Sequence, residues 1–119
     1  VPSHSQLALW GGETHTGLSV VHNAVDVASW RPSEVPLAQR ELVWSGRITP
    51  TKGTALALCA AHAAGVALTL AGSIDDETYF AREVQPLLDD RRRYVGHLEG
   101  EPLSQFIARG RALVMTPTW

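Results

Sequence analysis

The sequence of 119 residues is poor in lysine and cysteine, and both shortages narrow the possible functions. Lys52 is the only lysine, the remaining basic residues are arginines, and the formal net charge is −2. Because acidic residues are spread throughout and leave no basic face, we expect no binding to nucleic acid. Cys59 is the only cysteine, so no disulfide can form within the chain. A reducing, cytoplasmic compartment is therefore expected.

Long apolar runs and the common phosphate-binding patterns are also missing. The longest apolar stretch is far shorter than the roughly 20 residues that a membrane span requires. No G-x-G-x-x-G pattern occurs, and the P-loop pattern fails because the order is Lys52-Gly53-Thr54, with Thr49 in place of the upstream glycine. No His/Cys cluster has metal-ligand spacing, so no metal is expected. The length and the 45% hydrophobic content allow at most one ordinary domain.

The strongest local signal is the turn over residues 46–53, which joins the clearest strand pattern to the clearest helix pattern. A strand is predicted over residues 42–44, and a helix follows that ends at Gly65. Such a crossing places backbone N–H groups and the positive end of the helix dipole at the carboxyl edge of a parallel sheet, where anions bind. Arg47 and Lys52 would add two positive charges there; a solvated turn without a ligand is the alternative. The expected apolar stripe of the helix comprises Ala55, Leu56, Cys59, Ala60, Ala63 and Ala64.

The rest of the chain alternates between strand and helix patterns. Further strands are predicted over residues 18–22, 66–71, 94–95 and 112–115, and a helix over residues 102–109. Another helix is predicted to begin at Asp75 or Asp76, with a kink or end near Val84 because Pro86 follows. This alternation predicts an α/β domain with a Rossmann-like parallel sheet of about five strands. Residues 1–16 have no period and are interpreted as a linker or the tail of a preceding domain, and residues 17–119 as a partial nucleotide-sugar-binding domain.

Several short segments occur in an order typical of one known family. His22-Asn23-Ala24-Val25-Asp26 is followed by Trp30-Arg31-Pro32, and Gly46-Arg47 by Lys52-Gly53. Ala71-Gly72, Tyr94-Val95-Gly96-His97-Leu98 and Ala112-Leu113-Val114-Met115-Thr116-Pro117 with Trp119 come after them. Over roughly residues 18–119, this order resembles the C-terminal, donor-binding domain of retaining glycosyltransferases of group 1, or family 4, which have the GT-B architecture of two Rossmann-like domains. Ala24 stands where the family usually has glycine.

The resemblance implies a role for each matched position. Arg47 and Lys52, on the turn that begins at Gly46, would hold the diphosphate of a nucleotide sugar. The loops at Gly72 and at Gly96-His97-Leu98 would form the nucleoside pocket, the latter mainly through backbone groups. The donor is thus a substrate, and no cofactor or metal is implied.

The resemblance also implies that much of the active site lies elsewhere. In the family, a glutamate-rich motif that contacts the donor sugar follows the position of Trp119, and a separate N-terminal domain binds the hydroxyl acceptor. We therefore expect a piece of a longer, bacterial-like enzyme, inactive alone, that is cytoplasmic or membrane-peripheral through the missing domain. No catalytic residue is assigned to this chain.

Two other interpretations stay open at this point. A sugar-nucleotide epimerase or a phosphorylase can share the GT-B architecture, and a non-catalytic α/β module could serve assembly and bind no nucleotide. A doubly wound sheet ordinarily has about six strands with helices on both faces, so we expect this sheet to lack covering elements. Exposed apolar faces and a free strand edge would then favour self-association of the fragment.

Overall fold

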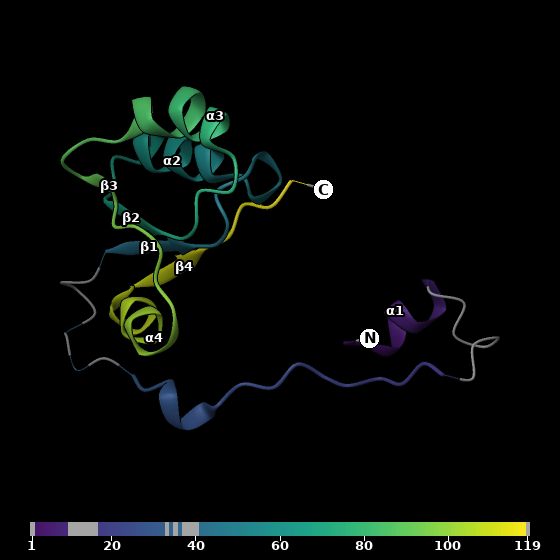
Figure 1. Cartoon of the computed structure of the whole chain (residues 1–119). Coiled ribbons are helices and arrows are strands. Elements are labelled where there is room, and N and C mark those ends of the chain that lie inside the picture. Colours follow the sequence, from purple (N-terminus) through teal and green to yellow (C-terminus); the bar gives the residue numbers. More distant parts are fainter. Residues whose placement is uncertain (1, 10–16, 33, 35, 37–40, 119) are drawn as a thin grey trace.

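A computed structural model describes residues 2–9, 17–32, 34, 36 and 41–118, in which a parallel sheet lies between two helical layers (Figure 1). Its strands are β1 (Leu42–Ser45), β2 (Leu68–Ala71), β3 (Arg92–Tyr94) and β4 (Ala112–Val114). Their spatial order is β3-β2-β1-β4, and every neighbouring pair is parallel. The predicted Rossmann-like α/β class is confirmed, with four strands in place of about five.

The two central strands form the core because most of their side chains are apolar and buried. β2 is buried along its whole length, and β1 is buried at Val43 and Trp44. On one face of the sheet, Trp44, Leu68 and Leu70 pack with side chains from the helices. The parallel register aligns Trp44 with Leu70, so the carboxyl ends of both strands reach the same edge.

Helix α2 (Thr54–Ala63) follows β1 through a short 3-10 turn, η3 (Pro50–Lys52), and covers that apolar face. The predicted stripe was wrong, because Leu56 is 53% exposed and Cys59 is also exposed. The helix carries alanine and leucine on several sides, so apolar spacing alone could not choose the buried face. The side chains buried under the helix are Thr54, Ala57, Leu58 and Ala61.

The segment after β2 passes through three helical types. It begins as α3 (Glu77–Tyr79), widens to a π-helical turn, η4 (Phe80–Val84), and tightens to a 3-10 turn, η5 (Gln85–Leu87). Asp76 caps it by accepting a hydrogen bond from the Tyr79 amide at 2.8 Å. The expected change at Val84 before Pro86 is confirmed, because proline cannot continue the hydrogen-bond ladder.

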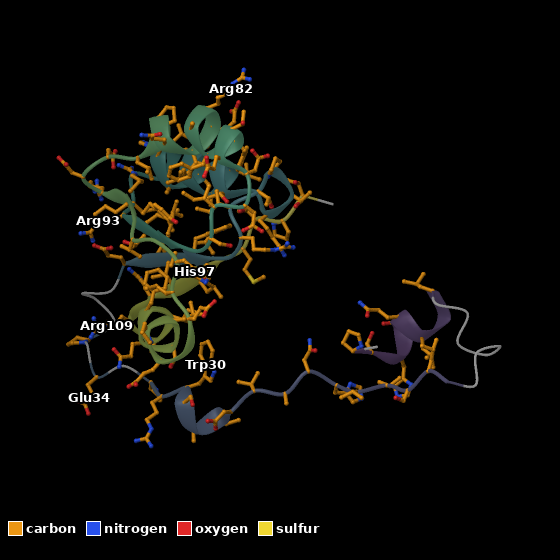
Figure 2. All side chains as sticks on the ribbon, in the orientation of Figure 1. Trp30, Glu34, Arg82, Arg93, His97 and Arg109 are labelled. Atoms are coloured by element: carbon orange, nitrogen blue, oxygen red, sulfur yellow. The ribbon has the colours of Figure 1, made fainter. Side chains whose placement is uncertain are left out.

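The opposite face of the sheet carries α4 (Gly100–Arg109), which connects β3 to β4 and packs on β1 (Figure 1). A short 3-10 turn, η1 (Val27–Ser29), packs against α4, and the Ser104 hydroxyl donates to the Ser29 carbonyl. Trp30 follows this turn and lies close to α4 (Figure 2). Asp26 caps η1, accepting from the Ala28 amide at 3.1 Å.

The predicted first strand over residues 18–22 was wrong. These residues run without strand pairing, and Val21 is 70% exposed. A strand forms only where neighbouring backbone groups complete its ladder, and no described strand lies beside this segment. Upstream, residues 4–9 form a short helix, α1 (His4–Leu9), well away from the sheet in Figure 1. The proposed boundary at residue 16 lies outside the described residues, as does Trp119.

Candidate functional site

Three glycines at the carboxyl edge of the sheet lie side by side. The Gly46 amide donates to the Ala71 carbonyl at 3.1 Å, and the Gly72 amide donates to the Gly96 carbonyl at 2.9 Å. A Cβ on Gly72 would come within 1.7 Å of the Gly46 carbonyl oxygen, so the two loops touch through bare backbone. Gly46, Gly72 and Gly96, predicted from three separate segments, therefore form one row across the ends of β1, β2 and β3.

Gly53 likewise allows two backbone segments to come close, where the β1–α2 turn meets the segment after β4. Its φ of +66° lies in the left-handed region, and a Cβ would approach the Thr116 carbonyl oxygen to 1.8 Å. The Thr116 hydroxyl donates to the Gly53 carbonyl at 2.7 Å. The chain after β4 is thereby held against the start of α2.

Lys52 lines a small cavity at this junction. The cavity measures about 120 Å³ and lies between the end of β1, the turn and the segment after β4. Lys52 is half-buried, and it makes no ion pair with any other described residue. A cation without a protein partner at the start of a helix suits an anionic ligand. The lining residues are Trp44, Ser45, Gly46, Lys52, Met115, Thr116 and Pro117.

Arg47 lies on the other side of the turn. Its side chain is 68% exposed, and its guanidinium group lies 3.6 Å from a carboxylate oxygen of Asp75. Asp75 belongs to the loop after β2, beside Gly72 and Ser73. Arg47 and Lys52 are thus both at the carboxyl edge, as predicted, but they approach it from opposite sides of the β1–α2 turn.

The first turn of α2 is held by Tyr79, the last residue of α3. The Ala55 amide donates to the Tyr79 hydroxyl at 3.0 Å, and the Ala57 amide donates to the Gly53 carbonyl at 3.0 Å. The hydroxyl of Thr54, in the same turn, is buried and has no hydrogen-bond partner among the described residues. Tyr79 therefore fixes the end of the helix that the candidate site uses.

The predicted loop after β3 divides between two places. Gly96 joins the glycine row, whereas the His97 ring, half exposed, hydrogen-bonds to the Glu99 carboxylate at 2.7 Å. Leu98 lines a separate cavity of about 540 Å³ between α4 and the sheet. The structure thus brings Gly96 to the edge and turns the side chains of His97 and Leu98 toward other parts of the loop and α4.

A polar network lies on the α4 face of the sheet. The Thr69 hydroxyl donates to Glu41 at 2.7 Å, and Arg93 donates to the same carboxylate at 3.0 and 3.1 Å. The hydrogen bond from Thr69, with further help from Arg93 and against the opposing effect of burial, holds the pKa of Glu41 below its ordinary value of 4.5. This network braces the amino end of β1, away from the glycine row.

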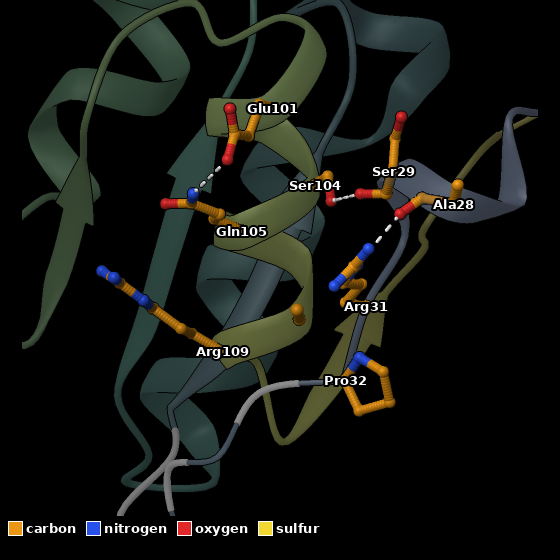
Figure 3. Close-up of a pocket in the computed structure, with 9 residues that line it drawn as sticks. Ala28, Ser29, Arg31, Pro32, Glu101, Ser104, Gln105 and Arg109 are labelled. Atoms are coloured by element: carbon orange, nitrogen blue, oxygen red, sulfur yellow. Dashed lines mark hydrogen bonds between the residues drawn. The ribbon is translucent and has the colours of Figure 1, made fainter.

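A third cavity lies outside the predicted site. It measures about 500 Å³ and is lined by side chains of residues 28–32 and of α4 (Figure 3). In Figure 3, the Arg31 side chain folds back to the Ala28 carbonyl, to which it donates at 3.2 Å. Gln105 and Glu101 bind each other at 3.0 Å on the facing helix. Its polar groups are therefore largely paired within the protein.

Neither a metal-binding cluster nor a membrane-spanning helix occurs in the described part of the chain. No cluster of three or more His, Cys, Asp or Glu side chains there could hold a metal ion. None of its helices is both long and apolar enough to cross a membrane.

Sequence reasoning missed Asp75 and Tyr79 as neighbours of the turn. Asp75 was considered only as a possible helix cap, a role that Asp76 fills. Both residues follow β2 by a few positions, and parallel neighbours end at the same edge. The spacing from the strand end could therefore have placed Asp75 near Arg47, which it contacts.

The fold and this edge define a class: an α/β domain with a parallel sheet whose glycine-lined loops and cations gather at the carboxyl ends of the strands. The structure matches that of AviGT4, a glycosyltransferase involved in avilamycin A biosynthesis, with a TM-score of 0.66 and 27% sequence identity. The match covers 94% of this chain and 33% of AviGT4, so the chain spans about a third of that protein. No protein-family model and no curated protein matches the sequence. In its fold, the chain is a glycosyltransferase-like α/β domain.

Proposed function

We propose that the chain is the donor-binding part of a retaining glycosyltransferase of the GT-B type, which transfers a sugar from a nucleoside diphosphate to a hydroxyl acceptor. The observation that carries the proposal is the β1–α2 turn, where Lys52 lines a cavity beside Gly46 and has no described acidic partner. The likeness to a glycosyltransferase supports it further.

The chemistry of the transfer explains why cations are needed at this edge. When the sugar leaves, negative charge grows on the phosphate oxygens of the nucleoside diphosphate. Positioned cations can stabilise that charge more strongly in the transition state than in the ground state. Arg47 offers a planar fork of donors and Lys52 a mobile point charge. The glycine row lets the diphosphate approach the backbone closely, whereas side chains at these positions would block that approach.

The first prediction concerns Lys52. A charge-assisted hydrogen bond contributes about 1.5–3 kcal/mol, so Lys52→Ala should weaken nucleotide binding by roughly one to two powers of ten. We would titrate the 15N-labelled chain with UDP, GDP, ADP and NAD and follow the amide shifts. One diphosphate should move the amides of residues 46–53, Gly72 and Gly96, and Lys52→Ala should abolish these shifts.

Arg82→Ala is the matched control, because Arg82 is an exposed cation on the helical layer far from this edge (Figure 2). It should leave the shifts unchanged. A folded chain that responds to no nucleotide would contradict the proposal, provided that a chain extended past Trp119 is equally silent. In that case the α/β assembly module would be favoured, for which Lys52→Ala leaves partner affinity unaltered.

A further inference from the structure

Asp75 is an acidic residue that lies beside Arg47, one of the two cations of the proposed diphosphate site. Its carboxylate lies 3.6 Å from the Arg47 guanidinium group, and its side chain is 33% exposed. It does not cap α3, because Asp76 does so. Asp75 is therefore available to act on Arg47, and the following inference rests on the proposed function of that residue.

The loop after β2 holds this carboxylate in place. The Ser73 hydroxyl donates to one oxygen of Asp75 at 2.6 Å, and the Ser73 carbonyl accepts from the Ile48 amide at 2.7 Å. A parallel bridge also pairs Ile48 with Ile74. These contacts tie the loop to the β1–α2 turn on the residue after Arg47, so the other oxygen of Asp75 is presented to Arg47.

The pair is loose on the side of Arg47. A charge-assisted hydrogen bond has a heavy-atom distance of about 2.7–2.9 Å, and the observed 3.6 Å is longer. With 68% of its side chain exposed, the guanidinium group can turn away from Asp75 without leaving a buried charge behind. The carboxylate, fixed by Ser73, stays where it is.

We propose that Asp75 is a built-in counter-ion that competes with the diphosphate for Arg47 and limits the affinity of the site for nucleotide. A diphosphate that recruits Arg47 must displace this pairing, and its charge then lies near a fixed carboxylate of the same sign. The effect weakens the binding of the donor and of the released nucleoside diphosphate alike, so Asp75 keeps the exchange of nucleotide fast. Asp75 is a positioning residue in this scheme, since it acts through Arg47.

The test compares inorganic pyrophosphate and UDP binding to the native chain and to Asp75→Asn by NMR titration. Asparagine can still accept from Ser73, and equal melting temperatures would establish that the variant is folded. Asp75→Asn should bind both ligands about three- to tenfold more tightly at about 10 mM salt, where the Debye length is about 30 Å. The gain should shrink at about 0.15 M salt.

Two controls separate competition for Arg47 from a general change of charge. Glu77→Gln removes the same charge two residues away, from an exposed side chain that pairs with no other described residue. It should gain at most about half as much, because Glu77 forms no ion pair with Arg47 and its Coulomb interaction with the site weakens with distance. In an Arg47→Ala background, Asp75→Asn should also lose most of its gain.

Each outcome assigns the failure to one idea. If the native chain binds but Asp75→Asn binds equally or more weakly, the counter-ion inference is wrong and the proposed function stands. An equal gain in Glu77→Gln would overturn the inference in the same way. If a folded native chain, all variants and a chain extended past Trp119 ignore both ligands, the proposed function itself fails, and the inference with it.

Discussion

At the scale of single residues, Gly53 and Gly65 separate two reasons for a glycine. Both have φ near +65°, but a Cβ on Gly53 would lie 1.8 Å from the Thr116 carbonyl oxygen, whereas a Cβ on Gly65 would meet nothing within 4 Å. Gly65 thus serves the backbone conformation alone. Gly53 serves that conformation and also allows the segment after β4 to close on the turn.

Replacing each glycine by alanine should measure these two contributions. Gly65→Ala should cost about 1–2 kcal/mol, the strain of a left-handed residue with a side chain. Gly53→Ala should cost about 2 kcal/mol more, because the Thr116 segment must retreat and break two hydrogen bonds worth about 1 kcal/mol each. These bonds are Thr116 hydroxyl to Gly53 carbonyl at 2.7 Å and Thr118 amide to Thr51 carbonyl at 2.9 Å.

Urea denaturation of both variants provides the comparison. The Gly53→Ala chain should also lose protection of the Thr118 amide from hydrogen exchange, whereas Gly65→Ala should keep it. Equal losses of stability in the two variants would mean that the close approach at Thr116 carries no energetic weight.

Sequence reasoning found the residues whose type alone indicates a turn or a charged site. Gly46 and Lys52 lie within one turn, and strand endings located Gly72 and Gly96, so the row across the sheet could be predicted. The side-chain contacts could not, because the partner of Arg47 depends on how far the loop after β2 reaches. Whether any of these residues binds a ligand stays a prediction.

At the scale of elements, the first turn of α2 is fixed by a hydrogen bond to a residue of α3. The Tyr79 hydroxyl accepts the Ala55 amide at 3.0 Å in the first turn of the helix, where N–H groups have no partner within the helix itself. Tyr94 does comparable work nearby, because its hydroxyl donates to the Gly72 carbonyl at 2.8 Å. Burial raises the pKa of Tyr94 above its ordinary value of 10.0.

Tyr79→Phe should therefore loosen the start of α2. Loss of one part-buried hydrogen bond should lower the free energy of unfolding by about 0.5–1.5 kcal/mol, and the Ala55 amide should exchange faster with solvent. Hydrogen exchange followed by NMR measures this directly. Tyr94→Phe makes the same chemical change at the end of β3 and should leave the Ala55 amide protected. If hydrogen exchange at Ala55 is unchanged in Tyr79→Phe, the capping role is refuted.

The elements also show where apolar patterns mislead. Strand and helix types were predictable for β1, β2 and α4, because their patterns agree with their turn residues. The buried face of α2 was not, since alanine on every side leaves the burial of Leu58 to the sheet beneath it. The apolar residues near Val21 were mistaken for a strand because no sequence pattern reports whether a partner strand lies alongside.

At the scale of the whole molecule, two rules explain which face of the sheet each helix covers, given the order β3-β2-β1-β4. Parallel strands need crossovers, and right-handed crossovers place the helices after β1 and β2 on one face. The return from β3 to β4 then crosses the other face, which is where α4 lies. The parallel α/β class was therefore predictable from the alternation of strands and helices, whereas the order and the number of the strands were not.

β4 is an edge strand of the described sheet, and two apolar side chains are exposed along it. Leu113 is 43% exposed, and Met115, just past the strand, is 72% exposed. An unpaired edge with apolar side chains is a template for another strand. We therefore predict that the chain self-associates at high concentration through this edge, which sedimentation velocity over a concentration series would detect.

Met115→Lys should weaken that association about tenfold, because burying a methionine side chain contributes about 1.5 kcal/mol or more and a lysine cannot be buried there cheaply. Leu56→Lys is the matched control, since Leu56 is 53% exposed on α2, away from the edge. If both variants associate as the native chain does, the contact lies elsewhere on the molecule. If the native chain sediments as a monomer at high concentration, the prediction is wrong. In that case β4 is too short to pair with a second copy of the chain, and the exposed apolar residues beside it form no contact between copies.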